Sequence, residues 1–185
     1  MARVRKLVGE KCFLSPICVN DAELYTHWLN DLEITRNLTV ANSVINIDTE
    51  AGFLASLSKE HNYGIVDLVT DELIGTCGFS FLNHFDRTAE LGIFIGNKNY
   101  LHRGYGSEAV RLLLDYGYRY LNLHNVMLRV MDFNTNAAEA YKKIGFREIG
   151  RRRQCEPRDG KMIDIIYMDI LPEDLYGKQN KYNEI

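Results

Sequence analysis

A strand, a helix and a second strand follow one another between Ala89 and Met131, and this succession constrains the fold more than any other feature of the chain. The run Ala89–Ile95 is apolar, apolar residues recur at helical spacing from Val110 to Leu121, and Val126–Met131 is again a strand-like run. A helical crossover joins strands that run parallel in one sheet. The chain is therefore predicted to adopt an α/β fold.

The other apolar runs alternate with turn formers and predict strands that pair antiparallel. They lie at Val4–Ser15, where Gly9-Glu10 divides the run in two, and at Tyr63–Val69, Leu73–Leu82, Phe146–Gln154 and Met162–Ile170. Further helices are expected to begin near Asn20 and Asp48, and a short one to end at Gly145. We predict a mixed, mostly antiparallel sheet of about seven strands, with the strands of Gly92 and Val126 as its parallel pair and helices on both faces.

The length of 185 residues suits one compact domain, which we place at residues 1–171 with 172–185 as a C-terminal tail. The 22 basic and 25 acidic residues nearly balance, which argues against a general nucleic-acid partner. No apolar stretch is long enough for a signal peptide or a membrane span, so a cytoplasmic protein without a membrane partner is expected. The cysteines and histidines lack metal-ligand spacing, and no metal is predicted.

The loop before the central helix, Leu101-His-Arg-Gly-Tyr-Gly106, has the pattern of an anion site. Glycines let a ligand approach the backbone, and the free amides and dipole of a helix start favour a phosphate. A plain glycine loop is the alternative. A Walker A loop is excluded because Ser107 follows Gly106 without the required lysine, and the dinucleotide fingerprint Gly104-x-Gly106-x-x-Ala109 fits poorly because about eight residues separate it from the strand.

Two motifs together resemble those of the GNAT N-acetyltransferases. The glycine loop resembles that family's acetyl-CoA pyrophosphate loop, Gln/Arg-x-x-Gly-x-Gly/Ala, except that Leu101 stands at the first position. The stretch Asn134–Phe146 resembles the family's Asn-x-x-Ala-x-x-x-Tyr-x-x-x-Gly-Phe. The resemblance covers about Leu14 to Leu171 and implies the acyl-CoA N-acyltransferase fold, in which the parallel pair splays apart.

Two branches of this family are similar to different parts of the chain. Ala89–Gly92 and the helix near Asn20 resemble the branch that acetylates ribosomal-protein N-termini, whereas Leu114–Leu123 resembles spermidine acetyltransferases. The resemblance implies direct transfer of acetyl from acetyl-CoA to a primary amine. We predict a protein or peptide N-terminal amine as the acceptor, with a polyamine as the alternative; a homo-oligomer is left open.

The resemblance also implies an acetyl-CoA site. The backbone at Phe94 and Ile95 would pair with the pantetheine arm, and an amide near Ile95 would stabilise the oxyanion. The glycine loop would hold the phosphates through the amides of Gly104 and Gly106. The other residues assigned to the cofactor are Leu101, His102, Arg103, Tyr105, Ser107 and Asn134.

Several of these residues have plainer alternatives. Asn134 is also a suitable helix N-cap, and His102 and Arg103 are also suitable solvated residues. The same holds for Lys142 and Lys143, which are candidates for the adenosine 3′-phosphate.

Two residues are assigned to catalysis. Tyr141 is implied to be the general acid that protonates the departing CoA thiolate, and a core tyrosine is the alternative. Glu90 is the candidate general base, acting directly or through water, and a solvated strand residue is the alternative. An α-amino group with a pKa of about 8 needs less help from a base than a polyamine nitrogen at about 10.4.

Two other functional classes stay open. A nonenzymatic acyl-CoA binder would keep the glycine loop and dispense with Tyr141. A nicotinamide oxidoreductase would need an acidic ribose ligand, for which Asp132 is the only candidate.

The acceptor site is expected in the variable segment Trp28–Asn46 and the hairpin near Pro157. Asp31 and Glu33 would attract a cationic acceptor there. The run Arg151-Arg152-Arg153 lies on a predicted strand, whose alternation should place these side chains on opposite faces, so we predict that the three do not form one patch.

Overall fold

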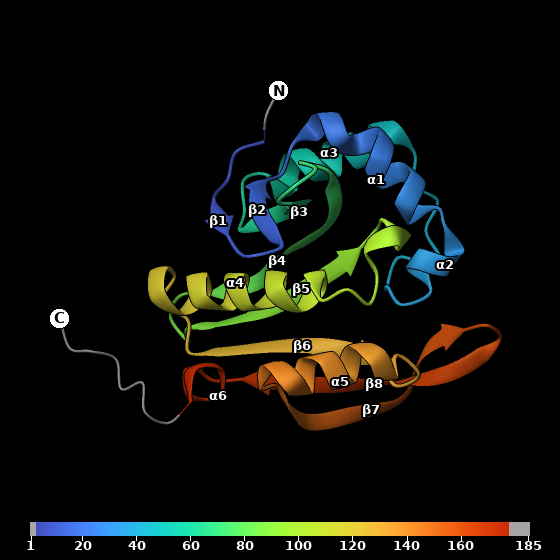
Figure 1. Cartoon of the computed structure of the whole chain (residues 1–185). Coiled ribbons are helices and arrows are strands. Elements are labelled where there is room, and N and C mark those ends of the chain that lie inside the picture. Colours follow the sequence, from blue (N-terminus) through green and yellow to red (C-terminus); the bar gives the residue numbers. More distant parts are fainter. Residues whose placement is uncertain (1–2, 178–185) are drawn as a thin grey trace. The chain divides into compact units, whose positions relative to one another are not determined.

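The computed structural model describes residues 3–177, and the part of the expected tail at 178–185 lies outside the described residues. The strands are β1 (Leu7–Val8), β2 (Cys12–Pro16), β3 (Asn62–Asp67), β4 (Leu73–Asn83), β5 (Thr88–Ile95), β6 (Asn125–Met131), β7 (Arg147–Arg158) and β8 (Lys161–Ile170). The α-helices are α1 (Ala22–Leu29), α2 (Leu32–Thr35), α3 (Ile47–Leu57), α4 (Tyr105–Tyr120), α5 (Thr135–Ile144) and α6 (Pro172–Tyr176), and the short 3₁₀ helices are η1 (Val19–Asp21) and η2 (Lys98–Tyr100) (Figure 1).

The strands form one mixed sheet in the order β1-β2-β3-β4-β5-β6-β8-β7. β5 and β6 pair in parallel from Thr88↔Asn125 to Glu90↔Met127, which confirms the prediction from the crossover. The pairs β1–β2, β2–β3, β3–β4, β6–β8 and β7–β8 are antiparallel. Eight strands form rather than about seven, because both halves of the first apolar run become strands.

The chain divides into two compact units, and it passes from one unit to the other within β4, within β5 and within α4. The first unit holds the described residues up to Ser80 together with Gly92–Leu113, and the second holds Phe81–Leu91 together with the described residues from Leu114 onward. The parallel pairing of β5 with β6 lies in the second unit, whereas β5 belongs to the first unit from Gly92 on.

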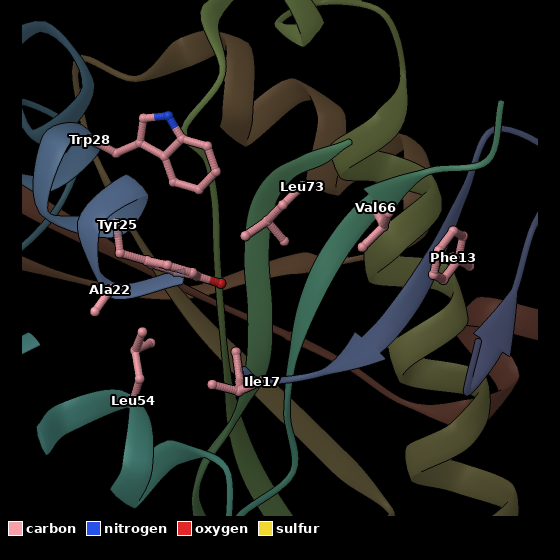
Figure 2. Packing of buried hydrophobic residues seen from close by; sticks show 8 residues of the cluster. All are labelled: Phe13, Ile17, Ala22, Tyr25, Trp28, Leu54, Val66 and Leu73. Atoms are coloured by element: carbon pink, nitrogen blue, oxygen red, sulfur yellow. The ribbon is translucent and has the colours of Figure 1, made fainter. Parts of the chain in front are cut away.

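The first unit packs its helices on strand side chains. Figure 2 shows Tyr25 and Trp28 of α1 and Leu54 of α3 in one apolar cluster with residues of the strands. The cluster comprises Phe13, Ile17, Ala22, Tyr25, Trp28, Leu54, Val66 and Leu73. Gly96 leaves room for Trp28, since a Cβ on Gly96 would stand 2.1 Å from the indole ring. Gly96 thus allows the indole ring to pack directly against the backbone that follows β5.

In the second unit, helix α5 begins and ends at cap residues. Asn134 caps its start, its Oδ1 accepting the N–H of Ala137 at 3.3 Å. Gly145 ends the helix with φ of +130°, as predicted from the sequence, and its N–H donates to the carbonyl of Tyr141. The caps therefore define the helix that carries Tyr141.

Candidate functional site

The glycine loop, Leu101–Gly106, lies in the first unit and turns the chain from η2 into α4. His102 and Gly104 have φ of +58° and +88°, in the left-handed region. Glycine tolerates this conformation at no steric cost, whereas a β-branched residue does not. Gly104 is thus required by the turn itself.

Helix α4 presents unpaired backbone donors at this turn. The amide of Glu108 donates to the carbonyl of Gly104 at 3.0 Å, closing the first helical turn, so the amides of Tyr105, Gly106 and Ser107 precede it without an intrahelical acceptor. A Cβ on Gly106 would approach only Ile93 and Ile95 side chains, at 3.8 and 3.9 Å. The backbone is therefore open to a ligand and fits an anion such as a phosphate.

Tyr105 anchors the loop to the end of β3. Its hydroxyl donates to Asp67 Oδ2 at 2.6 Å, and its ring meets that of Tyr100 edge-on at 5.1 Å. The hydrogen bond to Asp67 and burial raise the pKa of Tyr105 to about 12. Burial raises the pKa of Asp67, but hydrogen bonds from Tyr105 and Thr70 outweigh it and leave that pKa lowered. Tyr105 thus holds the loop in place through its side chain.

The turn between β1 and β2 lies against the first turn of α4. Glu108 Oε1 accepts the backbone N–H groups of Lys11 at 2.9 Å and Cys12 at 3.3 Å. A hollow of about 430 Å³ opens here, lined by Gly9, Glu10, Gly104, Ser107, Glu108 and Arg111. Sequence reasoning missed the contribution of the turn, because no local pattern joins residues 92 or more positions apart.

The remaining loop side chains are exposed. Leu101 is 39 % exposed, and His102 is exposed as well. Arg103 donates to the carbonyl of Asn99 at 3.2 Å, and its guanidinium lies 5.7 Å from the centre of the Tyr100 ring. None of these contacts buries the cation of Arg103.

Replacing Leu101 by arginine is expected to leave the affinity for acetyl-CoA equal or to raise it, by a free energy of up to about 1 kcal/mol. The exposed position accepts a longer side chain, and an exposed ion pair adds little. Isothermal calorimetry measures the change in Kd. A loss of more than tenfold would show that this loop differs from that of the family.

Phe94 and Ile95 stand at the end of β5 in the first unit. The ring of Phe94 packs edge-on against Trp28 at 6.1 Å and Tyr25 at 6.2 Å. The amide of Gly96 donates to the carbonyl of Ile74 in β4 at 2.8 Å. The side chain of Phe94 therefore belongs to the apolar core of the first unit.

Glu90 lies in the second unit, on the paired part of β5. Its Oε1 accepts a hydrogen bond from Arg129 Nε at 2.7 Å, and its side chain is 16 % exposed. Arg129 comes from β6, the parallel neighbour of β5. The structure therefore holds this carboxylate in an ion pair.

Tyr141 lies on α5 in the second unit, and its ring meets Phe146 edge-on at 5.7 Å. Burial raises the pKa of Tyr141 to about 12, so its phenol keeps its proton at physiological pH. Lys142, on the same helix, pairs with Glu139 at 2.9 Å. The structure thus brings together the loop residues in the first unit, and places Glu90, Asn134 and Tyr141 in the second.

Asp31 and Glu33 do not stand as a free acidic pair. Lys98 Nζ lies 2.7 Å from Asp31 Oδ2 and 2.5 Å from Glu33 Oε2. The hydrogen bond from Lys98 lowers the pKa of Asp31, and both carboxylates raise the pKa of Lys98. A lysine of this chain therefore occupies the position expected to attract a cationic acceptor.

The prediction that the three arginines of β7 do not share a patch is wrong. Arg151, Arg152 and Arg153 line one hollow together with Gln154. The pairing of β7 with β8 shifts register between Arg152 and Glu156, and Gln154 has φ of +46°. The irregularity breaks the alternation on which the prediction depended.

Comparison with known proteins agrees with this geometry. The profile of the Acetyltransferase (GNAT) domain matches residues 11–147, most of the chain. The chain therefore belongs to the GNAT family of acetyltransferases and is an acetyl-CoA-dependent N-acetyltransferase.

Relatives cover much of its length. The uncharacterized N-acetyltransferase p20 of Bacillus licheniformis is 30 % identical over 176 residues, which are 92 % of this chain and 98 % of that protein. Spermidine N(1)-acetyltransferase of Escherichia coli K12 is 38 % identical over 129 residues, 69 % of this chain and 62 % of that protein. The crystal structure of spermidine N-acetyltransferase from Vibrio cholerae with CoA and spermine shares the fold, with a TM-score of 0.82 and 22 % identity over 91 % of this chain and 99 % of that one.

Two features are absent from residues 3–177. No helix in this range has the length and apolar character needed to cross a membrane. Nor does the range contain a group of three or more His, Cys, Asp or Glu residues arranged to hold a metal ion.

Proposed function

We propose that this acetyltransferase acetylates the N-terminal amine of a protein or peptide. The observation that carries the choice is the pairing of Lys98 with Asp31 and Glu33, which offsets one of the two negative charges that would otherwise face a polycation. A peptide N-terminus carries a single ammonium and does not need two carboxylates for its binding. Spermidine is the second candidate, because relatives named spermidine N(1)-acetyltransferase share 38 % identity over 129 residues.

The glycine loop is proposed to bind the phosphates of acetyl-CoA. The amides at Tyr105, Gly106 and Ser107 and the start of the α4 dipole supply a preformed set of donors. The backbone at Phe94 and Ile95 is proposed to hold the pantetheine arm, and the amide near Ile95 to stabilise the oxyanion. Acetyl-CoA supplies an activated thioester to this site.

Glu90 and Tyr141 are proposed to move the two protons. Glu90 takes a proton from the ammonium, directly or through water, so that the neutral amine attacks. Tyr141 gives its phenolic proton to the departing sulfur. Burial, which raises the pKa of Tyr141, also disfavours a bare thiolate and so makes the sulfur a stronger proton acceptor.

Replacing Glu90 by glutamine is expected to lower kcat/KM at pH 7 by about 10- to 100-fold. For a peptide the rate should recover near pH 9, because an α-amino group with a pKa of about 8 is neutral there. For a polyamine it should stay low until above about pH 10. A full pH–rate profile measures this shift.

Arg129→Gln is the control for the Glu90 variant, because it removes the ion pair and keeps the carboxylate. Arg129 itself is 41 % exposed, and the carboxylate of Glu90 stays in place, so this control should retain more activity than Glu90→Gln. If both variants lose activity equally, the ion pair is the essential feature and Glu90 is not the base.

The acceptor is tested by release of CoA thiol with a panel of peptides, spermidine, spermine and aminoglycosides. A higher kcat/KM for peptides than for polyamines supports the proposal. Preference for spermidine would overturn it and assign the chain to polyamine acetylation. Lys98→Met is then informative, because freeing Asp31 and Glu33 should raise activity toward polyamines and leave peptides unaffected.

A further inference from the structure

Lys11 lies over the glycine loop, although it comes from the turn between β1 and β2. Its Nζ donates to the carbonyl of Arg103 at 3.0 Å, across 92 positions of sequence. The same Nζ would stand 3.5 Å from a Cβ placed on Gly104. An ammonium has three donors, so the bond to Arg103 leaves others for a group above Gly104.

The backbone beneath Lys11 is held by the helix that the loop begins. Glu108 accepts the amides of Lys11 and Cys12, which ties the turn to the first turn of α4. Gly9 makes the approach possible, since a Cβ there would stand 2.0 Å from Glu108 Oε1. The position of Lys11 relative to the loop is therefore built into the first unit and is not that of a loose surface lysine.

The loop lacks the side-chain donor that its family pattern provides at the first position. Leu101 occupies the position of Gln or Arg and has no donor. The hollow beside Gly104 is also lined by the carboxylates of Glu10 and Glu108, which oppose an anion, and by the cation of Arg111. Lys11 adds a second cation, and its Nζ lies close to Gly104, where the missing donor would act.

We propose that Lys11 binds the diphosphate of acetyl-CoA and takes the part that position 101 plays in the family pattern. The inference rests on the proposed function of the glycine loop. It adds a ligand that comes from the β1–β2 turn, outside the motif.

The test is calorimetric binding of CoA and of dephospho-CoA, which lacks the 3′-phosphate. Lys11→Met and Lys11→Gln are expected to raise Kd about tenfold for both ligands, because each loses a charge-assisted hydrogen bond. Lys11→Arg should stay within about threefold of the unmodified protein, since the charge remains. Lys59→Met makes the same charge change at an exposed position after α3 and should leave Kd unchanged.

The glutamine variant separates a ligand from a structural lysine. Glutamine keeps an N–H donor and removes the charge, so full affinity in Lys11→Gln would mean that the cation of Lys11 does not bind the diphosphate, and the proposal would fall. A loss confined to CoA, with dephospho-CoA unaffected, would move Lys11 to the 3′-phosphate and also overturn it. A salt dependence of Kd that is shallower in Lys11→Met than in Lys59→Met supports it.

A rescue experiment gives a second, independent arm. In the Lys11→Met background, Leu101→Arg should recover most of the lost affinity, a larger gain than the same change makes in the unmodified protein. If Leu101→Arg restores no affinity and Lys11→Met binds CoA with the same Kd as Lys59→Met, the proposed role of Lys11 is rejected. The assignment of the glycine loop is unaffected by that result. If Gly104→Val also bound CoA normally, the loop itself would not be the acetyl-CoA site, and the proposed function of the loop would fail with it.

Discussion

Replacing Tyr141 by phenylalanine is expected to lower kcat by roughly 100-fold or more, while the Kd for acetyl-CoA stays unchanged. The change removes one hydroxyl and keeps the ring that packs on Phe146. The free energy of unfolding should therefore change by less than about 1 kcal/mol. Steady-state kinetics, calorimetry and thermal unfolding measure the three quantities.

The pH dependence sharpens this test. Burial raises the pKa of Tyr141 to about 12, so the phenol remains a proton donor across the usable range. The unmodified enzyme should show no loss of rate from this group up to about pH 10, where a solvated tyrosine would be half ionised. A decline in rate near pH 10 that is absent from Tyr141→Phe would show that the phenol of Tyr141 is solvated.

Tyr120→Phe is the matched control for the Tyr141 variant. Tyr120 is 74 % exposed and stacks on Tyr116, outside the motif that carries Tyr141. Its substitution should leave kcat unchanged. Full turnover in Tyr141→Phe would mean that this tyrosine has only a packing role and that water protonates the thiolate.

Replacing Gly104 by valine is expected to weaken acetyl-CoA binding by roughly 100-fold or more, because the side chain enters the space in front of the loop amides. The φ of +88° also strains any β-branched residue, which should cost about 1–3 kcal/mol of stability. Calorimetry on protein shown to be folded measures the affinity, and thermal unfolding measures the strain.

Gly160→Val separates backbone strain from loss of the site. Gly160 has a similar φ of +74° and no heavy atom within 4 Å of its added Cβ, and it lies in the turn between β7 and β8. Its valine variant should lose comparable stability and keep its affinity for acetyl-CoA. Unchanged affinity in folded Gly104→Val would contradict the assignment of the loop.

The elements that the sequence predicts are those that depend on local periodicity and local turn chemistry. The apolar run before the glycine loop, the helical spacing after it and the strand at Val126 together predicted the parallel pair. Gly145 ends α5 because only a residue that tolerates a positive φ fits that cap position. The glycine loop was equally visible, since its residues are neighbours in the chain.

Tertiary structure alone decided which distant residues meet this loop. Lys11 and Asp67 meet it because the strands order and register as they do, and no short pattern carries that information. The same holds for Lys98, which pairs with Asp31 and Glu33 from far along the chain. In β7 the register shifts between Arg152 and Glu156, where β7 advances four residues while β8 advances two, and this interrupts the period-two alternation beside the three arginines that line one hollow. The sequence by itself thus determined the elements, the family and the position of the glycine loop, whereas the ion pairs and hydrogen bonds around the loop and around Asp31 and Glu33 come from contacts that form only once the sheet has assembled.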